Sequence, residues 1–323
     1  MNDALHSGPA GSRPRWNSRS TVVIIGGQGE MGRLFSKFFS SHGFPVKVAD
    51  LDTPLTPERA VRESDFVVFS VPLHDTVSVI RSLVPYTRQD QLLMDLTSLK
   101  AGPVKEMLKS PASVTGLHPM FGGRVSSLAG QTLAACPVRI GAAEWHWLKG
   151  LFVQSGIKVK ECSPDEHDRM MSIIQVLFHL STMLIGRTFR TLDIDILETL
   201  EYTSPSYRIE MNLVGRIFAQ NPELYGAITQ MNPHTGGILT ALKEGLEVYE
   251  RLYRAGSLAG FKEDFEQSAR HLGAFCADAY RESSQILDFS VELANRQVQE
   301  NAAALRGSQG HGTQSCKSKS SKS

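Results

Sequence analysis

The sequence predicts an α/β fold, a doubly wound parallel sheet, followed by an all-helical region. Two observations carry this prediction. Up to Glu161, short apolar runs alternate with segments of helical periodicity, as strands and helices do in a parallel sheet. From Ser163 onward the apolar residues recur at helical spacing, and no strand pattern interrupts them. We therefore expect a disordered arm at 1–20, a sheet domain at 21–162, a helical domain at 163–300 and a disordered tail at 301–323.

The first strand and the turn after it organise the chain. Val22–Ile25 is a β-branched run that suits a strand buried on both faces. Gly27, Gly29 and Gly32 follow in G-x-G-x-x-G spacing, and Met31–Ser40 has the apolar stripe of a helix. In this context the first glycine allows a tight turn, the second lets a pyrophosphate approach, and the third lets the helix pack on the strand. The pattern predicts a Rossmann-type dinucleotide site.

The second strand, 45–49, runs into Asp50. A carboxylate there can accept hydrogen bonds from the adenosine ribose 2′-hydroxyl, which favours NAD over NADP. A glycine-rich turn without a ligand is the alternative interpretation. The cofactor-binding residues that we expect are Gly27, Gln28, Gly29, Glu30, Met31, Gly32 and Asp50, together with Val71 and Pro72 after the third strand.

The remaining elements follow from the same alternation. In the sheet domain we expect helices at 56–63, 75–83, 103–109 and 144–155, and strands at 65–71, 91–96, 113–117, 131–135, 138–140 and 158–161. In the helical domain we expect helical segments at 164–190, 193–202, 206–220, 222–230, 235–255 and 257–300. Long apolar helices of this kind commonly pack against a second copy, so we expect a homodimer.

Composition narrows the class of protein. The chain has 323 residues, a net charge of +1 and 41% hydrophobic residues, so no overall charge points to nucleic acid or to a membrane surface. No uninterrupted apolar run reaches the roughly 18 residues of a membrane span. The four cysteines show neither metal-ligand nor disulfide spacing, so we expect no metal site and a cytoplasmic location.

Candidate reactive residues follow the ends of the predicted strands, where ligands bind in open α/β sheets. His118 is the strongest candidate, because it ends a strand in the segment GLHPMFG and an imidazole can accept a proton near neutral pH. A histidine that only caps the strand is the alternative. In the helical domain, Arg208 and Arg216 lie eight residues apart on one predicted helix and suit a substrate with carboxylates. Ordinary surface arginines are the alternative there.

Taken together, these segments resemble the prephenate dehydrogenase family, in particular the dehydrogenase part of bifunctional chorismate mutase/prephenate dehydrogenases. The matching stretches are VVIIGGQGEMGRLF, SVPLH, DLTSLKAGP, GLHPMFG, DEHDRMM and SPSYRIEMNLVGRIFAQNPELY, which spread over residues 21–297. The resemblance implies an NAD-dependent oxidative decarboxylation of a cyclohexadienyl carboxylate, with a Rossmann domain and a helical dimerisation domain. It also implies that His118 is the catalytic base, that Arg216 binds a substrate carboxylate, that His179 takes part in substrate or product binding, and that Ser98 and Lys100 lie near the cofactor and substrate. Arg208 is a further candidate for substrate binding from its spacing to Arg216.

The sequence departs from the family pattern at several positions. Gly123-Arg124 follows HPMFG where relatives carry Pro-Asp or Pro-Glu, and Phe178 precedes His179 where relatives carry Arg. The segment 232–237 also differs, and the chain starts with twenty residues in place of a mutase domain. We expect these changes on the substrate side. They favour 4-amino-4-deoxyprephenate as substrate, giving 4-aminophenylpyruvate for antibiotic biosynthesis. Prephenate, for tyrosine biosynthesis, is the main alternative, followed by arogenate and by a catalytically silent cofactor-binding regulator.

Overall fold

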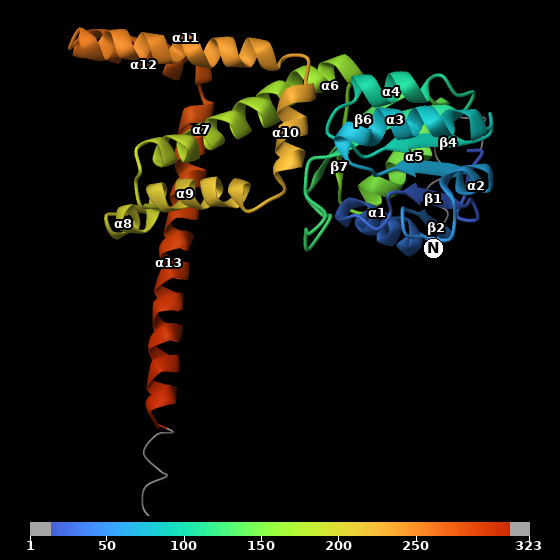
Figure 1. Ribbon diagram of the computed structural model, residues 1–323, viewed down its shortest axis with the longest axis horizontal. Coiled ribbons are helices and arrows are strands. Elements are labelled where there is room, and N and C mark those ends of the chain that lie inside the picture. The colour runs from blue at the N-terminus through green and yellow to red at the C-terminus, as the bar shows by residue number, and fades with distance from the viewer. Residues whose placement is uncertain (1–13, 311–323) are drawn as a thin grey trace, which may run out of the picture. The chain divides into compact units, whose positions relative to one another are not determined.

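The computed structural model describes residues 14–310, in which one seven-stranded sheet forms the N-terminal part (Figure 1). The strand order is β2-β1-β3-β4-β5-β6-β7. All neighbouring strands are parallel except β5 and β6, which are antiparallel. The strands are β1 (Val22–Ile25), β2 (Val46–Ala49), β3 (Phe66–Phe69), β4 (Leu92–Asp95), β5 (Ser113–Pro119), β6 (Thr132–Arg139) and β7 (Lys158–Glu161). The predicted doubly wound sheet is confirmed.

Strand β6 differs from the prediction in two ways. The two short strands expected at 131–135 and 138–140 form one strand, and it runs against β5. The connection between β5 and β6, residues 120–131, contains no helix. A parallel partner needs a crossover that is usually helical, so the chain returns antiparallel instead.

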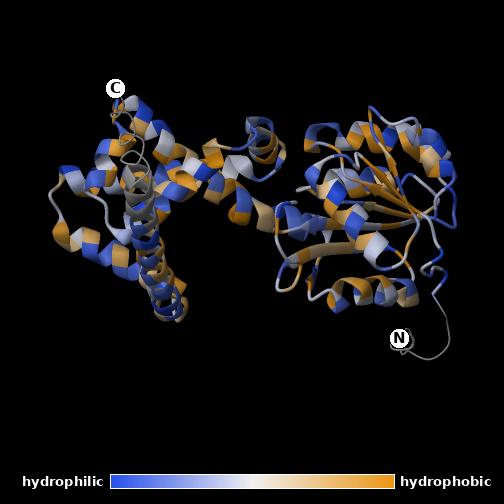
Figure 2. Ribbon diagram, turned by 90° about the horizontal axis from the view of Figure 1, so that it is seen from below, coloured by the Kyte–Doolittle hydropathy of each residue, from blue (hydrophilic) through white to orange (hydrophobic). Residues whose placement is uncertain are grey.

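Helices cover both faces of the sheet (Figure 1). One face carries α1 (Glu30–Ser41) and α5 (Ala142–Gln154); the other carries α2 (Pro57–Arg62), α3 (Leu73–Leu83), a 3₁₀ turn (Val84–Tyr86) and α4 (Ala101–Met107). Alternate residues of β1 point to opposite faces of the sheet. Val22 and Ile24 pack in the hydrophobic core under α1 and α5, and Val23 and Ile25 pack in the core under α2, α3 and α4. Hydrophobic residues dominate the central strands β1, β3 and β4, as burial on both faces requires (Figure 2).

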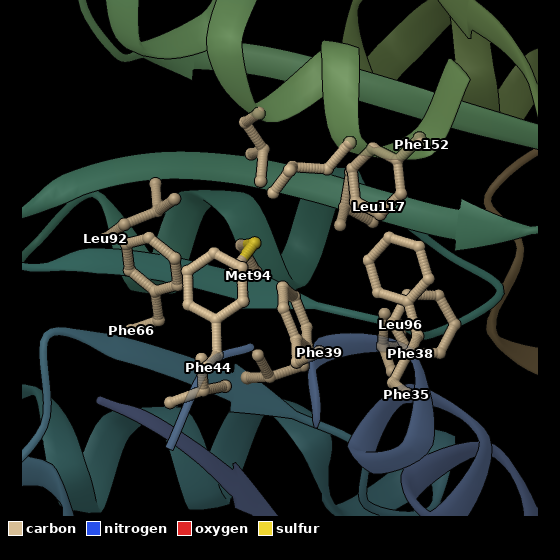
Figure 3. Close-up of a cluster of buried hydrophobic side chains, with 14 of the residues drawn as sticks. Phe35, Phe38, Phe39, Phe44, Phe66, Leu92, Met94, Leu96, Leu117 and Phe152 are labelled. Carbon is tan, nitrogen blue, oxygen red and sulfur yellow. The ribbon is translucent and has the colours of Figure 1, made fainter. Parts of the chain in front are cut away.

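Aromatic side chains fix α1 to the sheet (Figure 3). Phe38 of α1 stacks on Phe152 of α5 with ring centroids 5.2 Å apart, and Phe39 meets Phe44 edge to face at 5.8 Å. Each buried phenylalanine contributes about 1.5–3 kcal/mol through removal of apolar area from water. This packing holds the C-terminal half of α1 against the sheet.

The expected disordered arm needs a correction at its C-terminal end. Trp16 is only 3% exposed and meets Phe66 of β3 edge to face, with ring centroids 5.3 Å apart. Its indole nitrogen donates to the carbonyl of Asp90 at 3.1 Å. A large apolar ring with one satisfied donor gains enough from burial to order residues 14–20 against the sheet. Residues 1–13 lie outside the described part.

The C-terminal part is helical, as predicted. Its elements are α6 (Pro164–Met171), a π-helix (Ser172–Leu177), α7 (Phe178–Thr191), α8 (Ile196–Glu201), α9 (Pro205–Phe218), α10 (Pro222–Met231), α11 (Thr235–Arg254), α12 (Leu258–Leu272) and α13 (Phe275–Gly310). The segment expected as one helix at 257–300 breaks at Gly273, whose φ of +60° suits glycine. Residues 301–310, expected in the disordered tail, continue α13 because three alanines favour helix there; residues 311–323 lie outside the described part.

The chain forms two compact units that differ from the expected division at residue 163. The first unit runs to Leu180 and also contains Asn221–Ala241; the second contains Ser181–Gln220 and the chain from Leu242 onward. The helical residues of the first unit join the sheet domain through an apolar cluster of Leu73, Leu99, Val176 and Ile228. Burial of these side chains, rather than the change from strands to helices, therefore sets the boundary.

One helical stretch resembles a membrane span by length and composition. Pro164–Thr191 passes this test with a mean hydropathy of 1.3 in its most apolar window, although no uninterrupted apolar run was expected to be long enough. Such a stretch is weak evidence for a span, because core helices pass the same test. This one begins with the charged segment PDEHDR and supplies two buried polar side chains, His167 and Asp168.

We predict that Trp16→Ala lowers the free energy of unfolding by about 3–5 kcal/mol, because it empties a buried aromatic site. Leu51→Ala is the matched control, since Leu51 is 99% exposed and its truncation should change stability by less than about 0.5 kcal/mol. Urea denaturation followed by fluorescence and circular dichroism measures both. Equal stabilities of the two variants would show that residues 14–20 do not pack on the sheet.

Candidate active site

The glycine turn after β1 is shaped by close backbone contacts. Gly26 has φ of +80°, and a Cβ atom there would lie 2.6 Å from the carbonyl oxygen of Ser70. Gly26, rather than Gly27, is therefore the residue that requires glycine for the turn itself. Gly27 instead makes room for Val48, and a Cβ on Gly32 would lie 2.5 Å from the Gly26 oxygen. The sequence pattern assigned the tight turn to Gly27, one residue after Gly26, where the structure has it.

The turn leaves an opening at the N-terminus of α1. Gly29 is the N-cap residue, no side chain caps the helix, and a Cβ on Gly29 would have no neighbour closer than 3.5 Å. The first backbone amides of a helix lack intrahelical acceptors, so they attract an anion such as a pyrophosphate. Asp50 Oδ2 accepts a hydrogen bond from the Gln28 amide at 2.8 Å, which fixes this carboxylate beside the turn. The residues present thus fit a dinucleotide.

A cavity of about 560 Å³ opens beside the turn, within the first unit. Its lining comes from the start of α1, from the loops after β3 and β4, from the end of β5, and from the π-helix and α10. Of the predicted site residues it includes Glu30, Met31, Val71, Pro72, Ser98, His118 and His179. The parallel strands and the helical segment 172–180 therefore bring together residues that lie far apart in sequence.

His118 is buried and belongs to a chain of hydrogen bonds. Its Nδ1 lies 2.9 Å from Nε2 of His167, and Nδ1 of His167 lies 2.8 Å from Oδ1 of Asp168. A carboxylate only accepts hydrogen bonds, so His167 donates to Asp168 through Nδ1 and accepts from His118 through Nε2. This order leaves the lone pair of His118 on Nε2. The chain thereby fixes one tautomer of an imidazole that lines the cavity.

Asp168 also caps the first turn of α4. Its two carboxylate oxygens accept from the backbone amides of Lys100 at 2.7 Å and Ala101 at 2.9 Å. Burial opposes the charged form of Asp168, but the hydrogen bonds from His167 and from these two amides outweigh it and lower the pKa of the carboxyl. Asn232 completes the arrangement by donating to the Asp168 carbonyl at 2.8 Å.

The surroundings of His118 disfavour a positive charge on it. Burial, then the neighbouring His167, then Lys100 lower the pKa of His118 well below its ordinary value of 6.5. The imidazole is therefore neutral at neutral pH and ready to accept a proton.

Lys100 differs from its expected role in substrate binding. Its side chain is completely buried and forms an ion pair with Asp95, and Nζ donates to the Leu117 carbonyl at 2.8 Å. Thr97 donates to the same carboxylate, Asp95 Oδ2, at 2.5 Å. Lys100 does not line the cavity. It instead ties the loop after β4 to the backbone beside His118.

His179 reaches the cavity from the helical segment. Its ring meets Tyr225 of α10 edge to face at 4.8 Å, burial lowers its pKa, and its Nδ1 has no hydrogen-bond partner among the described residues. Twelve residues separate it from His167, which is about a third of a turn more than three full turns of α-helix. The π-helix between them has wider turns and takes up part of this excess.

Arg208 and Arg216 both lie exposed on α9, in the second unit. Their contact with substrate stays a prediction. Gly123 and Arg124, expected on the substrate side, instead contact Glu30 at the start of α1, on the cofactor side.

His167 and Asp168 were not among the predicted site residues, although the segment DEHDRMM is one of the stretches that resemble the family. The signal in the sequence was a histidine next to an aspartate, His167-Asp168, in the first turn after the N-cap sequence Ser163-Pro164. No local pattern relates this pair to His118, which lies 49 residues earlier. Within the described residues, no group of three or more potential ligands could hold a metal ion.

These features define a dinucleotide-dependent oxidoreductase. They are the strand, glycine turn and helix, the acidic residue after β2, and the buried imidazole at the end of β5. Comparison with known proteins refines this class. The family model "Prephenate dehydrogenase, nucleotide-binding domain" matches residues 44–152, and "Prephenate dehydrogenase, dimerization domain" matches residues 163–254.

Relatives and solved structures agree with the family models. The T-protein of Haemophilus influenzae is 32% identical over 273 residues, which cover 84% of this chain and 72% of that protein. The 4-amino-4-deoxyprephenate dehydrogenase of Streptomyces pristinaespiralis is 26% identical over 280 residues, covering 80% and 93%. A crystal structure of prephenate dehydrogenase from A. aeolicus with hydroxyphenyl propionate and NAD+ matches with a TM-score of 0.63 at 19% identity, covering 79% and 98%.

The chain belongs to the prephenate dehydrogenase family. It is accordingly an NAD-dependent oxidoreductase, and its sheet domain is the nucleotide-binding domain.

We predict that Gly29→Ala weakens NAD binding at least about tenfold, equivalent to about 1.4 kcal/mol, while stability changes little. A methyl group fits there in the free protein but occupies the space that the phosphates need. Gly32→Ala is the matched comparison, because its methyl group collides with the Gly26 carbonyl and should lower stability by about 1–3 kcal/mol. Calorimetric NAD titration and thermal unfolding separate the two effects; unchanged affinity in Gly29→Ala would refute the phosphate assignment.

Proposed function

We propose that the chain catalyses the NAD-dependent oxidative decarboxylation of prephenate to 4-hydroxyphenylpyruvate. The observation that carries this proposal is the neutral, tautomer-fixed imidazole of His118 in a cavity next to the glycine turn. The residues of the turn, Gly27 to Gly32, would hold the pyrophosphate of NAD, Asp50 the adenosine ribose, and Val71 and Pro72 the nicotinamide end. Bound NAD supplies the hydride acceptor.

In the proposed reaction, His118 acts as the general base. Nε2 takes the proton of the C4 hydroxyl while the hydrogen on C4 leaves as hydride. The C1 carboxylate then departs as carbon dioxide, and its bonding electrons complete the aromatic ring as a phenolate. The imidazolium of His118 returns the proton to this oxygen. Aromatisation drives the reaction forward, so the protein chiefly positions the substrate and moves one proton.

His167 and Asp168 support this role as positioning residues. A proton taken up by His118 is stabilised by the chain of hydrogen bonds that ends at the ionised Asp168. Because Asp168 is also held by the amides of α4, the chain keeps its geometry when the charge on His118 changes.

The carboxylates of the substrate need cationic or hydrogen-bonding partners. The described residues that line the cavity include no lysine or arginine, but Ser98 and His179 offer neutral donors. We assign the carboxylate contacts to Arg216 and Arg208 of α9 and the remaining polar contacts to Ser98 and His179. The dimerization-domain match and the exposed apolar residues of the second unit, such as Phe261, Phe265 and Phe275, support a homodimer. A cytoplasmic location fits a biosynthetic enzyme of this family.

The substrate 4-amino-4-deoxyprephenate is the second candidate. Phe178, which replaces the arginine of related sequences, lines the cavity. In addition, the Streptomyces relative is named 4-amino-4-deoxyprephenate dehydrogenase. The electrostatics favour prephenate, however. An ammonium group on C4 would lie next to His118, where burial and the neighbouring Lys100 already disfavour positive charge. A neutral hydroxyl carries no such cost.

The decisive experiment compares kcat/KM for prephenate, 4-amino-4-deoxyprephenate and arogenate with NAD under identical conditions. We expect prephenate to be preferred by about tenfold or more, since each 1.36 kcal/mol of differential transition-state stabilisation gives a factor of ten. Preference for the amino compound would overturn the choice of substrate while leaving the reaction class intact. Absence of NADH formation with all three would overturn the proposed function.

We predict that the acid limb of kcat/KM lies below pH 6.5. Activity requires neutral His118, and because burial lowers its pKa, protonation and loss of activity occur only as the pH falls through that lowered value. His118→Asn should lower kcat by about 10²- to 10⁴-fold and leave NAD affinity unchanged. Initial rates of NADH formation between about pH 5 and 8 measure the limb. A limb centred above 6.5, or normal turnover of the variant, would contradict the role of His118.

A further inference from the structure

The loop between β5 and β6 lies directly on the first turn of α1. A Cβ atom on Gly123 would lie 2.6 Å from the backbone carbon of Glu30 and 2.7 Å from its carbonyl oxygen. These are backbone atoms that cannot yield easily, so only glycine allows this approach. The loop also contributes Met120, Phe121 and Gly122 to the cavity that Glu30 and Met31 line as well. The loop thus forms one wall beside the beginning of the cofactor helix.

The next residue, Arg124, forms an ion pair across this contact. Its Nε donates to Oε1 of Glu30 at 2.7 Å, and Nη2 lies 2.5 Å from the same oxygen. The side chains are 86% and 55% exposed, so the pair alone adds little to stability. The pair matters because of the position of Glu30, which is the only acidic residue in the first turn of α1.

A carboxylate at that place has opposite effects in the free and the bound protein. In the free protein, Glu30 interacts favourably with the positive end of the helix dipole. When a pyrophosphate approaches the same amides, the carboxylate repels it. Asp50 adds a second negative charge, since it is bonded to the Gln28 amide of the same turn. A guanidinium paired with Glu30 cancels one of these charges where the phosphates arrive.

We propose that Arg124 sets the affinity for the cofactor by neutralising Glu30 at the pyrophosphate-binding turn. The β5–β6 loop is then part of the cofactor site, although it lies far from the glycine motif in sequence. Arg124 acts through Glu30 and is a positioning residue. The proposal rests on the assignment of the glycine turn to the pyrophosphate, and it does not depend on which acid is oxidised.

The test measures binding of ADP-ribose and of NAD by titration calorimetry, without substrate. At low ionic strength, Arg124→Ala should weaken both ligands roughly three- to tenfold, the effect of one partly screened charge. The loss should shrink near 1 M salt, where the screening length is about 3 Å. Arg124→Lys, which keeps the charge, should restore most of the affinity. Lys37→Ala removes another exposed positive charge further along α1 and should leave binding unchanged.

The double variant distinguishes neutralisation from a direct contact with phosphate. In a Glu30→Gln background there is no carboxylate to neutralise, so adding Arg124→Ala should cause no further loss. If the double variant keeps the full loss, Arg124 binds the phosphates itself and the proposal is wrong. Wild-type affinity in Arg124→Ala also overturns it. Because ADP-ribose carries no nicotinamide and needs no substrate, these outcomes are independent of the enzyme's turnover.

Discussion

The Asp168 carboxylate is the interaction on which the site depends. It is a buried negative charge with three donors, namely one imidazole and the backbone amides of Lys100 and Ala101 at the start of α4. A buried charge is stable only when hydrogen bonds replace its lost hydration, and here they come from a helix of the sheet domain and from the side chain next to it. The same carboxylate therefore joins the helical segment to the sheet and determines which nitrogen of His118 carries the proton.

A second buried charge pair lies beneath His118 and has a different task. Lys100 and Asp95 are both fully buried, and removing one partner of such a pair leaves an uncompensated charge that typically costs 3–5 kcal/mol. Lys100 holds the carbonyl of Leu117, the residue before His118, and so keeps the end of β5 fixed. Its positive charge also helps to keep His118 neutral. The base is thus positioned and electrically tuned by a residue that never reaches the cavity.

Much of the sheet domain could be predicted from the sequence because its signals are local. Strands buried on both faces, such as Val22–Ile25, and the glycine spacing after them are recognisable within a dozen residues. The features that were missed depend on contacts between distant residues. The bond between His118 and His167, the burial of Lys100 and the packing of Trp16 on Phe66 join positions separated along the chain by other elements. The type of a polar residue indicates which groups it can bind, but the fold determines which residue becomes its hydrogen-bond or ion-pair partner.

The π-helix at Ser172–Leu177 has a consequence for the length of the chain between the two histidines. An α-helix advances by about 100° per residue, so adding one residue to regular α-helical turns rotates everything after it by more than a quarter of a circle. A π-helix has wider turns, so it holds an additional residue with much less rotation of the helix that follows. Converting Ser172–Leu177 into regular α-helix would therefore turn His179 to a new direction, even though no side chain in the cavity had been altered.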